Sequence, residues 1–95
     1  MDYQRANMFE KATASYLAGL SVFPRDDRLH MGLGRSRFEA GDYPNAGDEF
    51  LKVLEIDPGQ IRAYFRLGRA YEEMGQKEKA IQAFAKYIEL QKQGE

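Results

Sequence analysis

Apolar, aromatic and small residues return at spacings of three and four in two segments of the chain, residues 27–40 and 62–74. In the first segment they are His30, Leu33, Gly34 and Phe38, and in the second they are Tyr64, Leu67, Gly68 and Tyr71. This is the spacing of an amphipathic α-helix, whose core-facing side returns about every 3.6 residues. A second helix is predicted after each of them, over residues 44–56 and 78–91. The pattern therefore predicts two successive pairs of helices.

Glycine and proline mark the ends of these helices. Gly41 and Gly75 follow the first helix of each pair, the position just past a helix where glycine is favoured. The sequence Asp57-Pro58-Gly59 is a strong stop signal after the helix over 44–56. Pro44 lies at the start of that helix, where its missing N–H costs little.

The two pairs of helices are copies of one unit. When residues 27–60 are placed on residues 61–94, a shift of 34 residues, ten of the 34 pairs are identical, against about two expected by chance. The identical pairs are Arg28/Arg62, Leu33/Leu67, Gly34/Gly68, Arg35/Arg69, Glu39/Glu73, Gly41/Gly75, Ala46/Ala80, Phe50/Phe84, Lys52/Lys86 and Glu55/Glu89. The chain is therefore predicted to stack repeated units.

The opening residues fall in the same frame. A further shift of 34 places Ala12, Tyr16, Leu20 and Pro24 on Ala46, Phe50, Leu54 and Pro58. Asn7 then falls on Gly41, and both residue types tolerate a positive φ at a turn. We therefore expect a partial repeat over residues 1–26 with a turn at Asn7. The alternative is one helix that runs through Asn7 over residues 2–20.

These residues resemble the tetratricopeptide repeat. The motif is Tyr64-x2-Leu67-Gly68-x2-Tyr71 followed by Ala80-x3-Phe84, and its second half returns as Ala46-x3-Phe50 and Ala12-x3-Tyr16. The resemblance implies an all-α fold of helix-turn-helix repeats, stacked in a short right-handed superhelix of about two and a half repeats. It implies a single domain over residues 1–95, divided into 1–26, 27–60 and 61–94.

Small residues have a mechanical role in such a stack. Gly34, Gly68, Ala46 and Ala80 are expected to let neighbouring helices approach to about 8–10 Å. Arg37 departs from the family pattern, which prefers an aromatic side chain there. We expect Phe38 to take over that packing.

In this family the first helix of each repeat lines a concave groove, which implies a peptide-binding site. The groove residues are predicted to be Arg28, Met31, Arg35, Arg62, Phe65, Arg66 and Arg69. Arg62 and Arg66 are like charges at i,i+4, which is mildly destabilising, and we expect them to converge with Arg28 on an external anion. The expected partner is an acidic or C-terminal peptide segment of another protein, for which the chain would serve as a scaffold or adaptor.

Two observations bear on the role of these arginines. Arg35–Glu39 and Arg69–Glu73 are i,i+4 pairs that would also suit a solvated helix face. Some tetratricopeptide proteins hold a C-terminal carboxylate with a basic clamp, and Arg62 and Arg66 resemble part of it. Gly32, however, stands where that clamp needs an asparagine, so we expect a looser groove for acidic peptides.

The last predicted helix suggests an alternative function. Tyr87 stands where the family keeps a small residue for the next repeat, whereas Ile81, Ile88 and Leu90 have no following helix to cover them. Arrays normally need a polar outer face at their ends. These four residues form a predicted association edge, through which the chain would act as a structural subunit or form a homo-oligomer.

Composition argues against other classes of function. The net charge of −1 gives no bulk attraction to nucleic acid, although the arginines with Phe65 and Phe38 could stack on single strands. We therefore expect no nucleic-acid partner. The start of the chain has no apolar signal-peptide core, and no apolar run is long enough for a membrane span, which leaves the cytoplasm as the default location.

Catalytic chemistry is not expected. The chain has no cysteine and one histidine, His30, which lies on the packing stripe and is predicted to be a core residue. No metal site, cofactor or catalytic residue follows from the sequence, and we predict that the protein is not an enzyme. The neighbouring carboxylates Asp48-Glu49 and Glu72-Glu73 are expected to be solvated.

Overall fold

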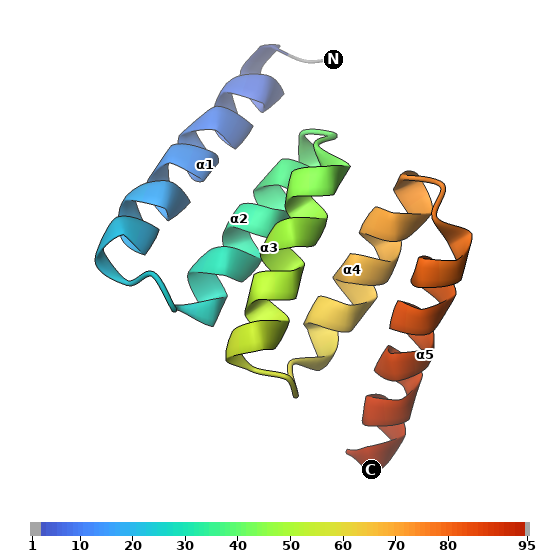
Figure 1. Cartoon of the computed structure of the whole chain (residues 1–95). Helices are drawn as coiled ribbons and strands as arrows, with labels where there is room; N and C mark the ends of the chain where they lie inside the picture. Colours follow the sequence, from blue (N-terminus) through green and yellow to red (C-terminus); the bar gives the residue numbers. More distant parts are fainter. Residues whose placement is uncertain (1–2, 95) are drawn as a thin grey trace.

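Five α-helices follow one another along the chain, each antiparallel to the one before it (Figure 1). The computed structural model describes residues 3–94. The helices are α1 (Tyr3–Val22), α2 (Asp27–Glu39), α3 (Tyr43–Ile56), α4 (Ile61–Glu73) and α5 (Lys77–Gln93). The predicted bounds of α2 to α5 are therefore confirmed to within two residues at each end.

The first helix differs from the expected partial repeat. α1 is continuous from Tyr3 to Val22, so the predicted turn at Asn7 is wrong and the alternative of one helix is correct. Among the described residues, only Gly41 and Gly75 adopt a positive φ, of 86° and 76°. An asparagine pays a larger steric cost than glycine in that conformation, so the chain at Asn7 stays helical.

The two glycine turns have the same hydrogen bonds. Gly41 N–H donates to the carbonyl of Phe38, and Asp42 N–H donates to the carbonyl of Arg37 at 2.8 Å. The turn at Gly75 repeats both bonds 34 residues later. This is the Schellman arrangement, which satisfies carbonyls at the end of a helix and needs a left-handed residue, here glycine. The two equivalent turns make α2–α3 and α4–α5 equivalent hairpins.

Each hairpin is held by an aromatic ring that lies on a glycine. A Cβ atom at Gly34 would lie 2.6 Å from the ring of Phe50, and one at Gly68 would lie 2.6 Å from the ring of Phe84. Any side chain at these glycines would therefore require the ring or the helix that carries it to move. The predicted role of both glycines in close approach is confirmed.

The core lies where the two hairpins meet. Ala46, Phe50 and Leu67 are buried together at its centre. Partly buried side chains surround them, namely Met31, Phe38, Leu54 and Tyr71. Phe38 also packs edge-on against Tyr43, with ring centroids 5.0 Å apart, so its predicted packing role is confirmed.

α1 packs on α2 alone among the described helices. A Cβ atom at Gly32 would collide with the ring of Tyr16, so the tyrosine lies directly on the glycine. Nearby, the hydroxyl groups of Thr13 and Ser36 are 3.0 Å apart. Gly32, the position at which a carboxylate clamp would need an asparagine, is therefore partly covered by α1.

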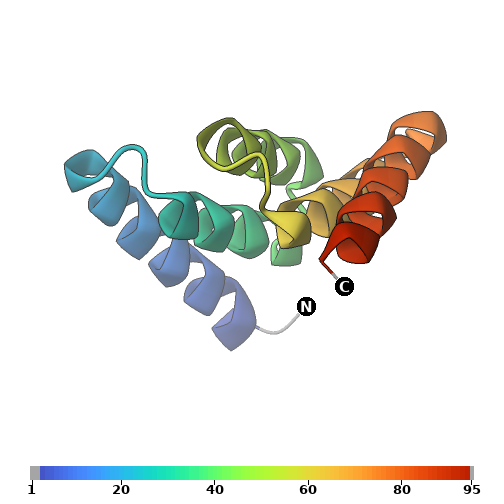
Figure 2. The ribbon, with the colours of Figure 1, turned by 90° about the horizontal axis from the view of Figure 1, so that it is seen from below.

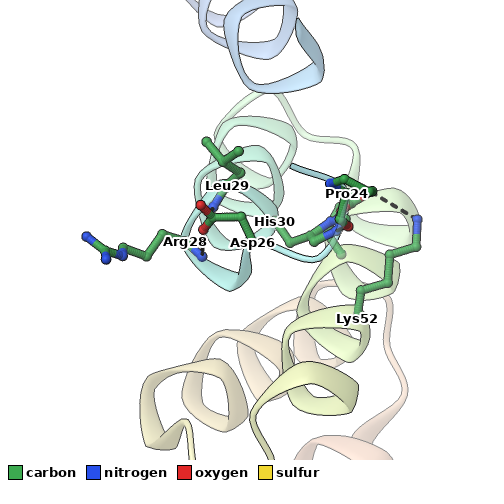
Figure 3. A network of polar contacts seen from close by, with 7 residues as sticks. Pro24, Asp26, Arg28, Leu29, His30 and Lys52 are labelled. Atoms are coloured by element: carbon green, nitrogen blue, oxygen red, sulfur yellow. Dashed lines mark hydrogen bonds and ion pairs between the residues drawn. The ribbon is translucent and has the colours of Figure 1, made fainter. Parts of the chain in front are cut away.

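A buried polar cluster joins the α1–α2 loop to α3 (Figure 3). His30 is buried as predicted, and its ring nitrogens contact the carboxylate of Glu49 and the carbonyl of Pro24. Lys52 lies 3.4 Å from the other oxygen of Glu49. The prediction that Glu49 is solvated is wrong, because its side chain turns inward to His30.

Candidate peptide-binding groove

α2 and α4 lie beside each other in the middle of the molecule, with α3 covering one side of them (Figure 2). The N-terminal half of α1 lies on the other side of α2 from α3 (Figure 2). Because α3 covers only one side, α2 and α4 are left with open faces on which their arginines lie. We name this surface the α2–α4 groove and define it by Arg35, Arg62, Phe65, Arg66 and Arg69.

Arg66 lies at the centre of the positive charge in this groove. Partial burial lowers the pKa of Arg66, and the positive charge of Arg35 lowers it further, as do Arg62 and Arg69. Glu39 opposes this shift. Three neighbouring guanidinium groups therefore act on Arg66 against one carboxylate, and the fold disfavours the cationic form of Arg66.

Arg69 rests on an aromatic ring at one end of the groove. Its guanidinium carbon lies 5.7 Å from the centroid of Phe38, within the range of a cation–π contact. Its Nε lies 3.8 Å from the carboxylate of Glu72, an exposed ion pair at i,i+3. The sequence predicts Glu73 as the i,i+4 partner of Arg69, whereas the structure pairs Arg69 with Glu72.

Phe65 provides apolar surface beside the arginines. Its side chain is 41% exposed, and the ring lies 5.9 Å from Phe84 and 5.4 Å from Tyr87, measured between centroids. A small cavity of about 40 Å³ opens next to it, lined by Phe38, Phe50, Phe65, Arg66 and Arg69. The cavity is large enough for a methyl group or a water molecule and has an aromatic floor with a cationic rim.

Two predicted groove residues lie apart from this cluster. Arg28 is in the first turn of α2 and is exposed, and Figure 3 shows it on the side of α2 away from Lys52. Arg28 is not among the charges that shift the pKa of Arg66, whereas Arg35 is. Arg35 therefore takes the place that was predicted for Arg28 beside Arg62 and Arg66. Met31 is half-buried and packs on the core.

Sequence reasoning left Phe38 and Tyr87 out of the predicted groove. Phe38 lies at the end of α2, where the repeat aligns it with Glu72 of α4. Tyr87 was assigned to the association edge, but its ring is half-buried on Phe65. Its contact depends on the crossing of α4 and α5, which no local pattern encodes.

Arg37 has a separate structural role. One of its terminal nitrogens lies 3.7 Å from the carboxylate of Asp42, and its Nε is buried without a hydrogen-bond partner among the described residues. The ion pair thus connects Arg37 of α2 to Asp42 in the turn at Gly41. The family pattern would place an aromatic side chain at position 37 instead.

The predicted association edge is exposed only in part. Ile81 and Ile88 are 66% and 50% exposed, whereas Leu90 is half-buried.

None of the described helices is both long and apolar enough to cross a membrane. Within residues 3–94, no three potential metal-ligating side chains of His, Asp or Glu come together.

The family model described as tetratricopeptide repeat matches residues 27–93. The chain belongs to this family, and the match covers α2 to α5. A search of curated proteins found no match to the chain.

Solved structures share the fold. A crystal structure of MamA matches with a TM-score of 0.88 and 25% identity, over 92% of this chain and 51% of that chain. The second tetratricopeptide domain of Spaghetti (RPAP3), bound to the HSP90 peptide SRMEEVD, matches with a TM-score of 0.83 and 20% identity, over 92% of this chain and 86% of that one. The chain thus spans about half the length of the MamA chain.

Proposed function

We propose that the chain is a protein-interaction module that binds an acidic segment of a partner protein in the α2–α4 groove. The observation that carries this proposal is the concentration of positive charge around Arg66, on which Arg35, Arg62 and Arg69 act in one direction and Glu39 in the other. Like charges held together oppose folding, and a bound carboxylate would remove that repulsion. The proposal assigns the module a scaffold or adaptor role and no chemical step.

The arginines would fix the position of the peptide. Guanidinium groups donate paired hydrogen bonds to carboxylates, and charge-assisted bonds are roughly twice as strong as neutral ones. Arg62 and Arg66 are one turn apart on α4, and Arg35 approaches Arg66 from α2, so an acidic side chain or C-terminal carboxylate between the helices would meet both. Arg28 would extend the positive surface towards the start of α2.

The aromatic residues would supply the apolar part of the contact. Phe65 is exposed beside the arginines and is supported from behind by Phe84 and Tyr87. The cavity between Phe38 and Phe65 fits one small apolar group. Met31 lies along α2 and would contact a longer peptide. We therefore propose a segment in which a small apolar residue neighbours an acidic one.

The peptide bound by Spaghetti (RPAP3) supports the same chemistry by analogy, since SRMEEVD carries three acidic side chains. At 20% identity the two proteins share the fold, and the analogy extends to ligand class alone. Gly32 lies under Tyr16 in this chain, so α2 offers no polar side chain there to hold a peptide backbone.

Fluorescence anisotropy with labelled SRMEEVD and an alanine-substituted version of it tests the proposal. We expect the acidic peptide to bind more tightly, with an affinity that falls as salt rises, and the Arg62→Glu/Arg66→Glu variant to lose at least tenfold. Arg25→Glu/Lys77→Glu is the matched control, because it makes the same change in net charge at exposed positions outside the groove. Equal affinity in the two variants, or for the two peptides, would refute the groove assignment.

A further inference from the structure

The phenol ring of Tyr16 occupies the place of a missing side chain on α2. A Cβ atom at Gly32 would collide with the ring carbons of Tyr16 and would lie 2.8 Å from its hydroxyl oxygen. Gly32 has no side chain of its own, so the polar end of Tyr16 stands where a side chain at position 32 would begin. A residue of α1 therefore supplies a hydroxyl group to this face of α2.

Two arginines flank this hydroxyl group. Arg28 and Arg35 lie four residues before and three residues after Gly32, spacings that place side chains on one face of a helix. Both arginines are exposed, and neither forms an ion pair with a carboxylate among residues 8–94. Within the same residues, the hydroxyl of Tyr16 forms no hydrogen bond. Three hydrogen-bonding side chains thus gather on one face of α2.

The repeat relates this cluster to the candidate groove. A shift of 34 residues puts Gly32 on Arg66 and Tyr16 on Phe50. Phe50 and Arg66 line the small cavity of the α2–α4 groove together. Tyr16 therefore lies beside α2 as Phe50 lies beside α4, and its hydroxyl group takes the place of the side chain that Gly32 lacks.

The exposure of this face does not come from a missing neighbour. The counterparts of Arg28 and Arg35 in the next repeat are Arg62 and Arg69. Both counterparts are exposed, although α2, α3 and α5 all contact α4. The arginines of α2 and α4 thus lie on the side of the stack that packing between helices leaves open.

We propose that Tyr16, Arg28 and Arg35 form a second anion site, here named the Tyr16 subsite, which holds a second carboxylate of the peptide bound in the α2–α4 groove. This inference rests on the proposed function, since it concerns the same ligand. A phenol hydroxyl donates a hydrogen bond, and a bond to a charged acceptor is stronger than one to a neutral acceptor. The arginines supply charge, and Tyr16 fixes the position of the carboxylate because its ring packs on Gly32.

The two sites set a spacing for the ligand. Arg66 is on α4 and the Tyr16 subsite is on α2, and neighbouring helices lie about 8–10 Å apart. An extended chain advances about 3.3 Å per residue, so acidic residues two or three positions apart would reach both sites. The probe SRMEEVD contains both spacings, since its acidic residues are the fourth, fifth and seventh.

Fluorescence anisotropy of labelled SRMEEVD with wild type and Tyr16→Phe tests this inference. Phenylalanine keeps the ring on Gly32 and removes the hydroxyl alone, so we expect about a fivefold loss of affinity at an unchanged melting temperature. Because the lost group is neutral, the affinity should fall with salt as steeply as in wild type. Tyr64→Phe is the matched control and should bind as wild type does, because Tyr64 is a half-buried tyrosine of α4 outside the groove.

Altered peptides identify the second carboxylate. Each acidic residue of SRMEEVD is replaced by alanine in turn, and the C-terminal carboxylate is replaced by an amide. One of these peptides should bind wild type more weakly than SRMEEVD does. The same peptide should lose little affinity for Tyr16→Phe, because the hydrogen bond is already absent there.

The outcomes separate the two proposals. Equal affinity of wild type and Tyr16→Phe for SRMEEVD, with Arg62→Glu/Arg66→Glu still weakened, would overturn the Tyr16 subsite and leave the groove in place. Equal losses in wild type and Tyr16→Phe for every altered peptide would also overturn it, since the hydroxyl would then act on the fold alone. A wild type that does not bind SRMEEVD would refute the proposed function and the subsite with it.

Discussion

The imidazole Nδ1 of His30 lies 2.7 Å from the carboxylate of Glu49, and both side chains are buried between α2 and α3. The other ring nitrogen, Nε2, lies 2.8 Å from the carbonyl oxygen of Pro24. A carbonyl only accepts, so Nε2 must carry a hydrogen. One further proton therefore bridges Nδ1 and Glu49, either as an imidazolium–carboxylate pair or as a carboxylic acid that donates to a neutral ring.

Removing Glu49 should break this bridge. Glu49→Ala leaves Nδ1 of His30 buried without a partner, and we expect a loss of about 1–3 kcal/mol in the free energy of unfolding. Glu49→Gln is the matched control, because its amide N–H can donate to the neutral ring in the same place. Urea titration of both variants provides the measurement. Equal loss in the two variants would contradict the hydrogen-bond assignment.

Gly68 and Gly47 should respond in opposite ways to substitution by alanine, because only Gly68 lies against an aromatic ring. Gly68→Ala places a Cβ 2.6 Å from the ring of Phe84, which must move, and we expect a loss of about 1–3 kcal/mol in the free energy of unfolding. Gly47→Ala meets its nearest neighbours at 3.8 Å, so the better helix propensity of alanine should raise stability by up to about 1 kcal/mol. Thermal unfolding of the two variants checks this difference, and equal effects would show that Phe84 adapts freely.

The charge around Arg66 predicts a conflict between stability and binding. The pKa of Arg66 is lowered, which means that the fold disfavours its cationic form. Arg66→Met keeps an unbranched side chain to pack and removes the charge, so we expect an unchanged or higher melting temperature together with weaker binding of SRMEEVD. High salt should stabilise wild type more than this variant, because salt screens the repulsion. A lower melting temperature would indicate that Glu39 outweighs the neighbouring arginines.

α1 should open separately from the rest of the protein. It packs on α2 alone among the described helices, with Tyr16 seated on Gly32. Tyr16→Ala should therefore speed hydrogen exchange of amides in α1 and leave those in α4 and α5 unchanged. Leu17→Ala, which removes a side chain that is 47% exposed, is the neighbouring control and should have a smaller effect. A uniform rise along the whole chain would show that α1 unfolds together with the repeats.

Several features of the fold were predictable because they are local. The positive φ of Gly41 and Gly75 depends on glycine at a helix end, and the sequence places both at the same point of the 34-residue period. The contacts of Phe50 with Gly34 and of Phe84 with Gly68 follow from the same period. The candidate groove was predictable in part, since Arg35, Arg62, Arg66 and Arg69 fall on the outer faces of two equivalent helices.

The amino-acid sequence by itself determined the repeat, its helices, its turns and the faces that carry arginine, because helix period and turn chemistry act over a few residues. Only the tertiary structure decided that α1 runs straight through Asn7, that Glu49 turns inward to His30, and that Tyr87 supports Phe65. It also decided that Arg35 rather than Arg28 acts on Arg66. Each of these depends on what a neighbouring helix places opposite the residue, and that is set by packing between elements distant in sequence.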